Sequence, residues 1–359
     1  MTHPNTLSRV RGSIIAGAIG DALGNPVEFI SRQSILTTYG SQGITQFDTH
    51  PRWTDTSGKA VFTDDTQMTL FTAEGLLNAD RTHSDAITAI TEAYLEWFGT
   101  QTGHKSEEHH HGTLRDLDAL NVRRAPGNTC LTALASLWCG KQPHNDSKGC
   151  GGVMRIAPIP LFAATHHMSI EEADKMSADA AKVTHLHPLG YIPAALMSHV
   201  IYRAVAEAQP TRERLIEWIK EGCDTLPQLF VSHAHDVAIM QRLALQAIEL
   251  AENDRPDIDN IAQLGEGWVG EEALAIALYC AVRHFDNLEQ ALIAAVNHNG
   301  DSDSTGAVTG NILGAAVGCE AIPQHFIDGI EQLDLLLSVA DALGGERGKG
   351  LRHSRSMRH

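Results

Sequence analysis

The chain has 359 residues, of which 43% are hydrophobic, and its formal net charge is −17. The length allows a sizeable core, and the negative charge argues against a non-specific nucleic-acid surface. No apolar run reaches the roughly 18 residues of a membrane span. Six isolated cysteines without a CxxC pair indicate neither a zinc knuckle nor a disulfide framework. We therefore expect a cytoplasmic monomer with neither a membrane nor a nucleic-acid partner.

The N-terminal third of the chain is predicted to alternate helices with long loops. Gly24 and Pro26 end the first helix, because glycine favours a helix end and proline resists continuation. Thr63 is an expected N-cap for the second. We predict helices over 8–23, 63–77 and 85–98, an irregular loop over 31–62, and a polar, His-rich loop or lid over 101–127.

The rest of the chain shows helical periodicity and almost no two-residue alternation. We see no internal repeat and no change of composition that would mark a domain boundary. The predicted fold class is all-α: a single compact domain of orthogonally packed helices over 1–345, then a basic, flexible tail at 346–359. Its further helices are expected over 129–139, 154–165, 170–183, 188–207, 211–221, 234–252, 271–284, 288–297, 305–318 and 324–343.

Two predicted helices carry stripes of small residues. Glycine recurs every four residues at 306, 310, 314 and 318, and a shorter stripe comprises Gly12, Ala16 and Gly20. A four-residue step keeps nearly the same helix face, and an interior glycine costs about 1 kcal/mol relative to alanine. The stripes therefore predict a close crossing of the two helices. Such a crossing brings Asp21 and Glu28 near the centre of the protein.

An acidic cluster precedes the second of these helices. Asp301 and Asp303 alternate with hydroxyl residues, and Ser304 or Thr305 is the expected N-cap. Carboxylates this close stay ionised most easily around a hard cation such as Mg²⁺, Mn²⁺ or Ca²⁺. An EF-hand loop is excluded because its twelfth position is Ile312 rather than glutamate. The alternative is an ordinary acidic helix cap.

A second acidic helix start carries Thr63, Asp64 and Asp65. Adjacent carboxylates point in different directions, so together the two helix starts supply enough ligands for two cations that share a bridge. Acids in a first helical turn are also common without metal. Glu28 is a further metal ligand or a general base, whereas Asp21 belongs to the site or bonds backbone amides at its turn.

The glycine-rich stretch from Ser147 to Arg155 exposes N–H groups that can hold a phosphate. It matches neither a dinucleotide-binding fingerprint nor a P-loop. His185 follows Thr184 at a predicted helix edge, where a histidine serves as a structural hydrogen-bonding group or lies beside an anion site.

Taken in order, five motifs resemble the ADP-ribosylglycohydrolase family. The resemblance implies an all-α fold around a central binuclear Mg²⁺ or Mn²⁺ site, with an ADP-ribosylated protein as substrate and ADP-ribose as product. The motifs are Gly20–Gly24 with Glu28, Thr63–Thr66, Ser147–Arg155, Thr184–His185 and Gly300–Ala307.

The resemblance also implies roles for individual residues. The catalytic residues are Glu28 and Asp303. The metal ligands are Thr63, Asp64, Asp65, Asp301, Asp303 and Ser304, the last standing where many members have threonine. The substrate-binding residues are Asp21, Gly127, Asn128, Ser147, Gly149, Cys150, Gly151, Gly152, Met154 and His185.

Some positions depart from the family pattern. Asn299-Gly300 replaces the usual Gly-Gly. Lys148 and Cys150 stand where hydrolases acting on serine carry an aromatic residue and an amide, which favours arginine as the acceptor. The His-rich segment 101–124 falls where members differ and is expected to meet the acceptor.

The implied reaction is metal-dependent hydrolysis of the N-glycosidic bond between ADP-ribose and an arginine side chain. Cations on the ribose hydroxyls would orient a water, and Glu28 or a metal-bound carboxylate would accept its proton. One alternative is a hydrolase of another ADP-ribose linkage, to serine, threonine, a nucleobase or an acetyl group. Another is a catalytically silent relative that binds ADP-ribose or a toxin.

Overall fold

The computed structural model describes residues 5–104, 107, 109 and 111–345. These residues form sixteen α-helices and four short 3₁₀ turns, and they contain isolated β-bridges but no β-strand. The predicted all-α class is therefore confirmed. None of the described helices is long and apolar enough to cross a bilayer. The predicted flexible tail at 346–359 lies outside the described residues.

The elements follow in chain order. They are α1 (Thr6–Gly24), α2 (Arg32–Tyr39), α3 (Asp64–Thr82), α4 (Ala86–Thr102), η1 (Leu114–Asp116), α5 (Asn128–Trp138), η2 (Cys150–Gly152), α6 (Pro158–Thr165), α7 (Ile170–Lys182), α8 (Pro188–Ala206), α9 (Arg212–Leu229), η3 (Val231–His233), α10 (Ala234–Ala251), α11 (Asp257–Ile261), α12 (Gly270–Arg283), α13 (Leu288–Val296), α14 (Ser302–Val317), η4 (Cys319–Ala321), α15 (Gln324–Gly329) and α16 (Leu333–Leu343).

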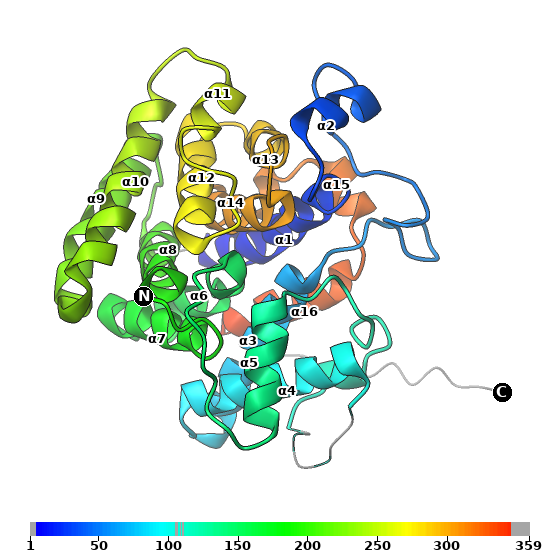
Figure 1. Cartoon of the computed structure of the whole chain (residues 1–359), viewed down its shortest axis with the longest axis vertical. Helices are drawn as coiled ribbons and strands as arrows, with labels where there is room; N and C mark the ends of the chain where they lie inside the picture. Colours follow the sequence, from blue (N-terminus) through cyan, green and yellow to red (C-terminus); the bar gives the residue numbers. More distant parts are fainter. Residues whose placement is uncertain (1–4, 105–106, 108, 110, 346–359) are drawn as a thin grey trace.

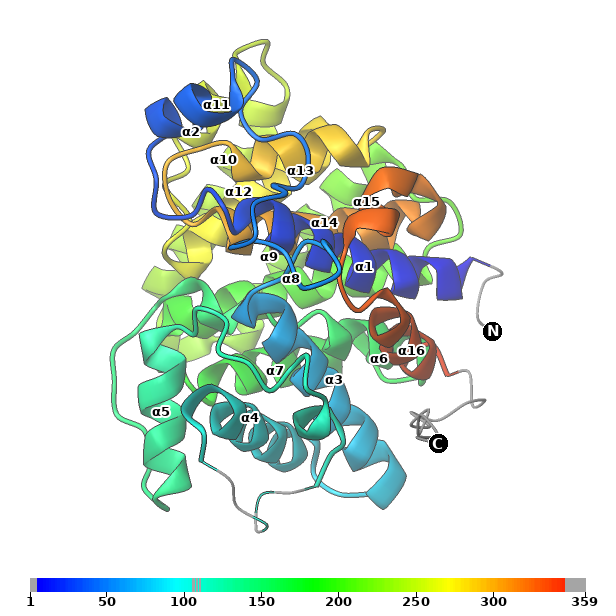
Figure 2. The same ribbon diagram turned by 90° about the vertical axis from the view of Figure 1, so that its right-hand side faces the viewer.

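Helices α1 and α14 lie side by side through the middle of the molecule (Figure 1). Both views place α12 and α13 on one side of this pair and α3 and α16 on the other (Figure 2). Every residue of α14 from Ser302 to Ala316 is buried. The two helices that carry the predicted acids and their neighbours therefore form the centre of the fold.

The predicted small-residue crossing of α1 and α14 is confirmed. A Cβ placed on Gly310 would lie 2.0 Å from the carbonyl oxygen of Ala16, and one on Gly306 would lie 2.4 Å from that of Gly20. The stripe on α1 extends to Gly24, where a Cβ would lie 2.3 Å from the carbonyl oxygen of Ser302. The backbones thus approach each other as closely as they do because side chains are absent.

Two reciprocal hydrogen bonds reinforce this contact. The hydroxyl of Ser13 donates to the carbonyl oxygen of Asn311 at 2.8 Å, and the Asn311 amide donates back to that of Ser13 at 2.8 Å. Both side chains are buried. Each polar group is therefore satisfied inside the core, and the pair sets the register of one helix against the other.

Several predicted boundaries were wrong. The predicted loop 31–62 contains α2, whose N-cap Ser31 accepts a hydrogen bond from the Ser34 amide at 3.2 Å. Only Ile35 of this helix is buried, so its apolar periodicity is too weak to reveal it. The predicted helix 324–343 is interrupted at Gln332, which has a φ of 53°. Short α11 was missed, α9 extends eight residues beyond the predicted end at 221, and α6 begins at Pro158 rather than at 154.

Candidate active site

The acidic side chains following α1 and opening α14 meet in one place. One carboxylate oxygen each of Glu28, Asp301 and Asp303 lies within 4.8 Å of the others. Asp301 and Asp303 are buried and Glu28 is partly buried. The close crossing of α1 and α14 produces this meeting, because Glu28 follows the end of α1 and the two aspartates begin α14.

The N-terminus of α14 orients its two aspartates. Asp301, and not the predicted Ser304 or Thr305, is the N-cap, and its carboxylate accepts the Ser304 amide proton at 3.3 Å. The Thr305 hydroxyl instead donates to the Asp301 carbonyl oxygen at 2.7 Å. The Ser304 amide also donates to Asp303 at 3.0 Å. The helix therefore starts three residues earlier than predicted, and its free N–H groups hold the acids.

Helix α3 supplies the second pair of acids. Thr63 is its N-cap, as predicted, and its hydroxyl accepts the Asp65 amide proton at 3.3 Å. Asp64 accepts a hydrogen bond from the amide of Gly127 at 3.1 Å, which joins a predicted metal ligand to a predicted substrate loop. Asp65 Oδ2 is buried and has no hydrogen-bond partner among the described residues. That oxygen is free to bind a cation.

Asp21 faces the backbone rather than the open side of the cluster. It is fully buried and accepts hydrogen bonds from the amides of Thr63 at 2.9 Å and Thr66 at 3.0 Å. The Thr66 hydroxyl adds a third bond at 2.5 Å. Asp21 thereby caps the start of α3 from α1, and the amides that it bonds are not those of its own turn, which the structural alternative predicted. Desolvation, with repulsion from Asp303, raises the pKa of Asp21 to about 7.

The buried carboxyl groups of this acidic cluster repel one another. Burial first, and then repulsion by Asp303, raises the pKa of Asp64, Asp65 and Asp301 well above the usual range. The same two causes raise the pKa of Glu28 to about 11. A divalent cation would remove both the repulsion and the unpartnered state of Asp65 Oδ2. The carboxylate and hydroxyl oxygens here fit a hard cation such as Mg²⁺ or Mn²⁺.

The glycine-rich loop lies against the acids. The Cys150 thiol donates to Asp301 Oδ2 at 2.8 Å, and the Ser304 hydroxyl lies 3.9 Å from the sulfur of Met154. Ser147 shares a hydrogen bond of 3.0 Å with Thr129, in the first turn of α5. The loop therefore lies between the acidic cluster and α5.

His185 lies against the glycine-rich loop at Gly149 and Gly151. A Cβ on Gly149 would lie 3.4 Å from His185 Nε2, and one on Gly151 would lie 3.2 Å from it. The Arg155 guanidinium donates to the Thr184 hydroxyl at 2.7 Å, which leaves the hydroxyl proton for His185 Nδ1 at 2.9 Å. This arrangement favours the proton on Nε2, facing the loop. Desolvation, with the charge of Arg155, lowers the pKa of His185 to about 3, so the ring is a neutral donor.

Two predicted substrate residues stand apart from these contacts. Gly152 packs on α8, since a Cβ there would lie 2.2 Å from the carbonyl oxygen of Gly190. Asn128 is exposed at the first position of α5, next to exposed Gly127. Gly152 thus has a packing role in the loop, and Asn128 is available to a ligand at the surface.

The sequence did not reveal the importance of Arg155. Its side chain is fully buried, lies 4.4 Å above the Tyr94 ring and donates to the Ala180 carbonyl oxygen at 3.2 Å. It places a positive charge behind the glycine loop. The position of Arg155 at the end of the glycine-rich stretch could have suggested a role near an anion. Its burial could not be predicted, because it depends on helices that are remote in sequence.

Asn299, noted above as a departure from the family pattern, has a structural contact. Its side-chain oxygen accepts the Arg32 amide proton at 2.8 Å. The loop before α14 is thereby attached to the start of α2.

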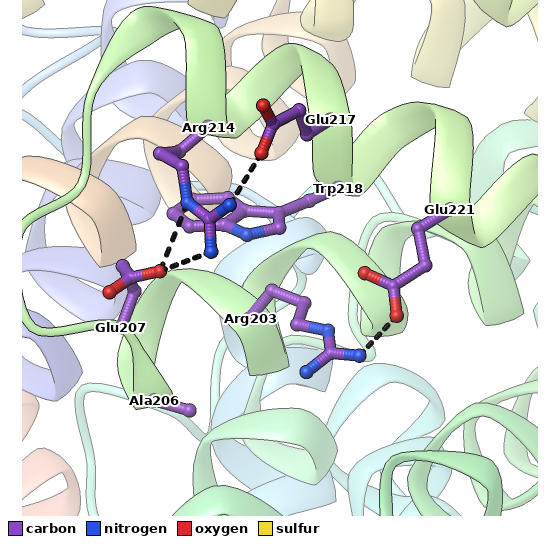
Figure 3. A pocket seen from close by; sticks show the side chains of 7 residues that line it. All are labelled: Arg203, Ala206, Glu207, Arg214, Glu217, Trp218 and Glu221. Atoms are coloured by element: carbon purple, nitrogen blue, oxygen red, sulfur yellow. Dashed lines mark hydrogen bonds and ion pairs between the residues drawn. The ribbon is translucent and has the colours of Figure 1, made fainter.

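A cavity of about 310 Å³ lies away from this site, between α8 and α9 (Figure 3). Its two arginines are paired with carboxylates: Arg214 with Glu207 at 2.7 Å and also with Glu217, and Arg203 with Glu221. These pairs offset the charges that an anionic ligand would need. The cavity therefore does not compete with the acidic cluster as a candidate active site.

Known proteins resemble this chain in sequence and in fold. The sequence model of the ADP-ribosylglycohydrolase family matches residues 2–352. The ADP-ribosylarginine hydrolase Tri1 of Serratia proteamaculans is 25% identical, over 94% of this chain and 79% of its own length. The ADP-ribosylhydrolase ARH3 of Mus musculus is 24% identical, over 92% and 90%. A solved ADP-ribosylglycohydrolase-related protein complex shares the fold, with a TM-score of 0.65 and 21% identity over 95% of this chain and 98% of that one. The chain therefore belongs to the ADP-ribosylglycohydrolase family.

Proposed function

We propose that this protein is a metal-dependent hydrolase that releases ADP-ribose from ADP-ribosylated arginine side chains of proteins. The observation that carries the proposal is the meeting of Glu28, Asp301 and Asp303 within 4.8 Å, beside a glycine-rich loop. Relatives that match nearly the whole chain are named as hydrolases of ADP-ribosylated groups. Their level of identity supports the reaction class more strongly than the choice of arginine.

Two divalent cations, Mg²⁺ or Mn²⁺, are proposed to occupy the acidic cluster. The ligands would be Thr63, Asp64, Asp65, Asp301, Asp303 and Ser304, all of which are buried. When bound, the cations supply charge neutralisation and ligation of ribose hydroxyls. The unpartnered Asp65 Oδ2 and the raised pKa of the neighbouring carboxyls support this assignment.

Side chains of the chain itself account for the hydrolytic step. Glu28 lies beside Asp303 and is partly exposed. Once bound cations offset the neighbouring negative charge that raises its pKa, its carboxylate can accept a proton from the attacking water. Asp303 lies next to Glu28, with one carboxylate oxygen of each within 4.8 Å, and helps to position it. The oxocarbenium-like transition state of glycoside cleavage is positively charged, so the surrounding carboxylates stabilise it.

Neutral donors are proposed to hold the diphosphate. The Nε2–H of His185 lies against Gly149 and Gly151, and the charge of Arg155 is behind it. The amides of Ser147, Gly149 and Cys150 donate to Asn145, Ser147 and Trp268, so the diphosphate would take the Nε2–H and the amides of other residues of the loop. They give a protein of net charge −17 a local site for an anion. Lys148 is not among these donors, because its ammonium pairs with buried Glu271.

The test measures release of ADP-ribose from an arginine-ADP-ribosylated protein and from serine- and threonine-linked conjugates. We expect turnover with added Mg²⁺ or Mn²⁺, loss of turnover in EDTA, and loss in Asp64→Asn and Asp303→Asn. Glu28→Gln should lose turnover and still bind ADP-ribose. Unchanged release in EDTA and in both aspartate variants would refute the metal-dependent reaction, and faster release from serine would refute the choice of arginine.

A further inference from the structure

Phe29 and Trp268 form an aromatic pair at the edge of the acidic cluster. Their ring centroids are 5.0 Å apart with an interplanar angle of 24°. Phe29 directly follows Glu28, yet 73% of its surface is exposed, so Trp268 covers one face and the other face is open. Its φ of 63° is in the left-handed region, which residues other than glycine rarely adopt. A strained, exposed ring beside a reactive carboxylate is typical of a ligand contact rather than of packing.

Backbone hydrogen bonds attach the pair to the site. The carbonyl oxygen of Trp268 accepts the Cys150 amide proton at 3.2 Å, and the Cys150 thiol binds Asp301. The indole N–H of Trp268 donates to the carboxylate of Glu266 at 3.3 Å, and the carbonyl oxygen of Glu266 accepts the Asp301 amide proton at 2.9 Å. Through Cys150 and Glu266, Trp268 is therefore connected to Asp301 of the acidic cluster.

The charges around the pair select the chemistry of its ligand. Exposed Glu266 accepts the indole proton of Trp268, and Glu28 directly precedes Phe29 in the chain, so each ring has an acidic neighbour. A planar cation stacks on an aromatic face and is attracted by such carboxylates. A neutral heterocycle would gain the stacking but not the charge attraction. Among ADP-ribose conjugates, the arginine guanidinium is the planar cation attached at the bond to be cut.

We propose that Phe29 and Trp268 form a platform that receives the guanidinium of the acceptor arginine, with Glu28 and Glu266 as its flanking carboxylates. This inference rests on the proposed function. The position agrees with the chemistry, because the leaving group must lie next to Glu28, which directly precedes Phe29. Both rings are thereby specificity-determining residues that contact the acceptor.

The first test compares Phe29→Leu and Trp268→Leu with the wild type. Leucine keeps an apolar side chain and removes the ring. We expect kcat/KM for arginine-linked ADP-ribose to fall roughly 2- to 30-fold in each variant, the range of a single cation–π contact. The dissociation constant of free ADP-ribose should not change. Val231→Ala is the matched control, since Val231 is 77% exposed and lies on η3, and it should retain full activity.

A second test measures binding without catalysis. Protein saturated with ADP-ribose and Mn²⁺ is titrated with Nα-acetyl-arginine amide or its neutral citrulline counterpart, and tryptophan fluorescence is followed. We expect the arginine compound to bind more tightly and the difference to shrink in Phe29→Leu. Equal binding of both compounds would overturn the inference. So would variants that weaken free ADP-ribose binding, because the rings would then hold the adenine. Wild-type protein that fails to cleave the arginine linkage would instead refute the proposed function.

Discussion

Adding a methyl group at Gly306 should move Asp301 and Asp303, at the start of α14, away from Glu28, which follows α1. Gly306 lies one turn after Asp303 on α14, where α14 packs on the backbone of α1 at Gly20. A Cβ there would lie 2.4 Å from the carbonyl oxygen of Gly20 and 2.9 Å from a methyl group of Val296. Because the nearest atom is backbone, no side-chain rotation can relieve the overlap in Gly306→Ala.

The size of the effect follows from that distance. Ordinary contact begins at 3.4 Å, so the first turn of α14 must move by about 1 Å. Overpacking of this kind costs about 1–3 kcal/mol, and the higher helix propensity of alanine returns about 1 kcal/mol. We expect a net loss of about 1–2 kcal/mol in unfolding free energy. The loss of activity should be larger, since a misplacement of about 1 Å at catalytic groups costs on the order of 100-fold.

Urea denaturation measures the first quantity, and steady-state release of ADP-ribose measures the second. Gly222→Ala in α9 is the matched control. A Cβ on Gly222 would lie 2.6 Å from the terminal methyl group of Leu196, which can rotate away. We expect this control to stay within about 1 kcal/mol of the wild type and to remain fully active. Wild-type activity in Gly306→Ala would refute the link between the helix crossing and the geometry of the site.

Three further outcomes are expected. Asp65→Asn should lower Mn²⁺ affinity at least roughly tenfold in calorimetric titration, because Asp65 Oδ2 has no hydrogen-bond partner in the described part of the chain; unchanged affinity would exclude it as a ligand. In EDTA, the melting temperature should fall as pH rises from about 5 to about 8, and added Mn²⁺ should remove this fall. The reason is that burial raises the pKa of Asp21 to about 7 and of Glu28 to about 11, so the folded state binds more protons than the unfolded chain; a melting temperature that rises with pH in EDTA would contradict this. Arg155→Lys should cost about 2 kcal/mol in urea denaturation and weaken ADP-ribose binding, because the bonds of Arg155 to Ala180 and Thr184 are lost; unchanged stability and binding would contradict that role.

The stripes of small residues on α1 and α14 show that a sequence pattern can predict a tertiary contact. Spacing of four along two segments nearly 300 residues apart predicted a contact that the fold contains, because only the absence of Cβ atoms lets two helices come so close. The same pattern predicted Glu28 near the centre of the protein, where the structure brings it to Asp301 and Asp303. By contrast, α2 was missed because a surface helix with one buried residue leaves little periodic signal.

Other features could not be inferred from neighbouring residues. The N-cap of α14 is Asp301 rather than Ser304 or Thr305, since all three are residue types favoured at an N-cap and packing selects one. Asp21 bonds the start of α3, 42 residues away, instead of amides in its own turn. Phe29 and Trp268 meet although no local motif connects them.

The sequence alone determined the helical class, the close crossing of α1 and α14, and the two acidic helix starts. These properties depend on periodicity, side-chain volume and cap chemistry, which are all encoded within a few turns of one helix. Only the tertiary structure decided which oxygen of Asp65 lacks a partner, which nitrogen of His185 faces the loop, and which rings flank Glu28. Those properties depend on burial and on contacts between distant segments, and desolvation there sets the charge state that the chemistry requires.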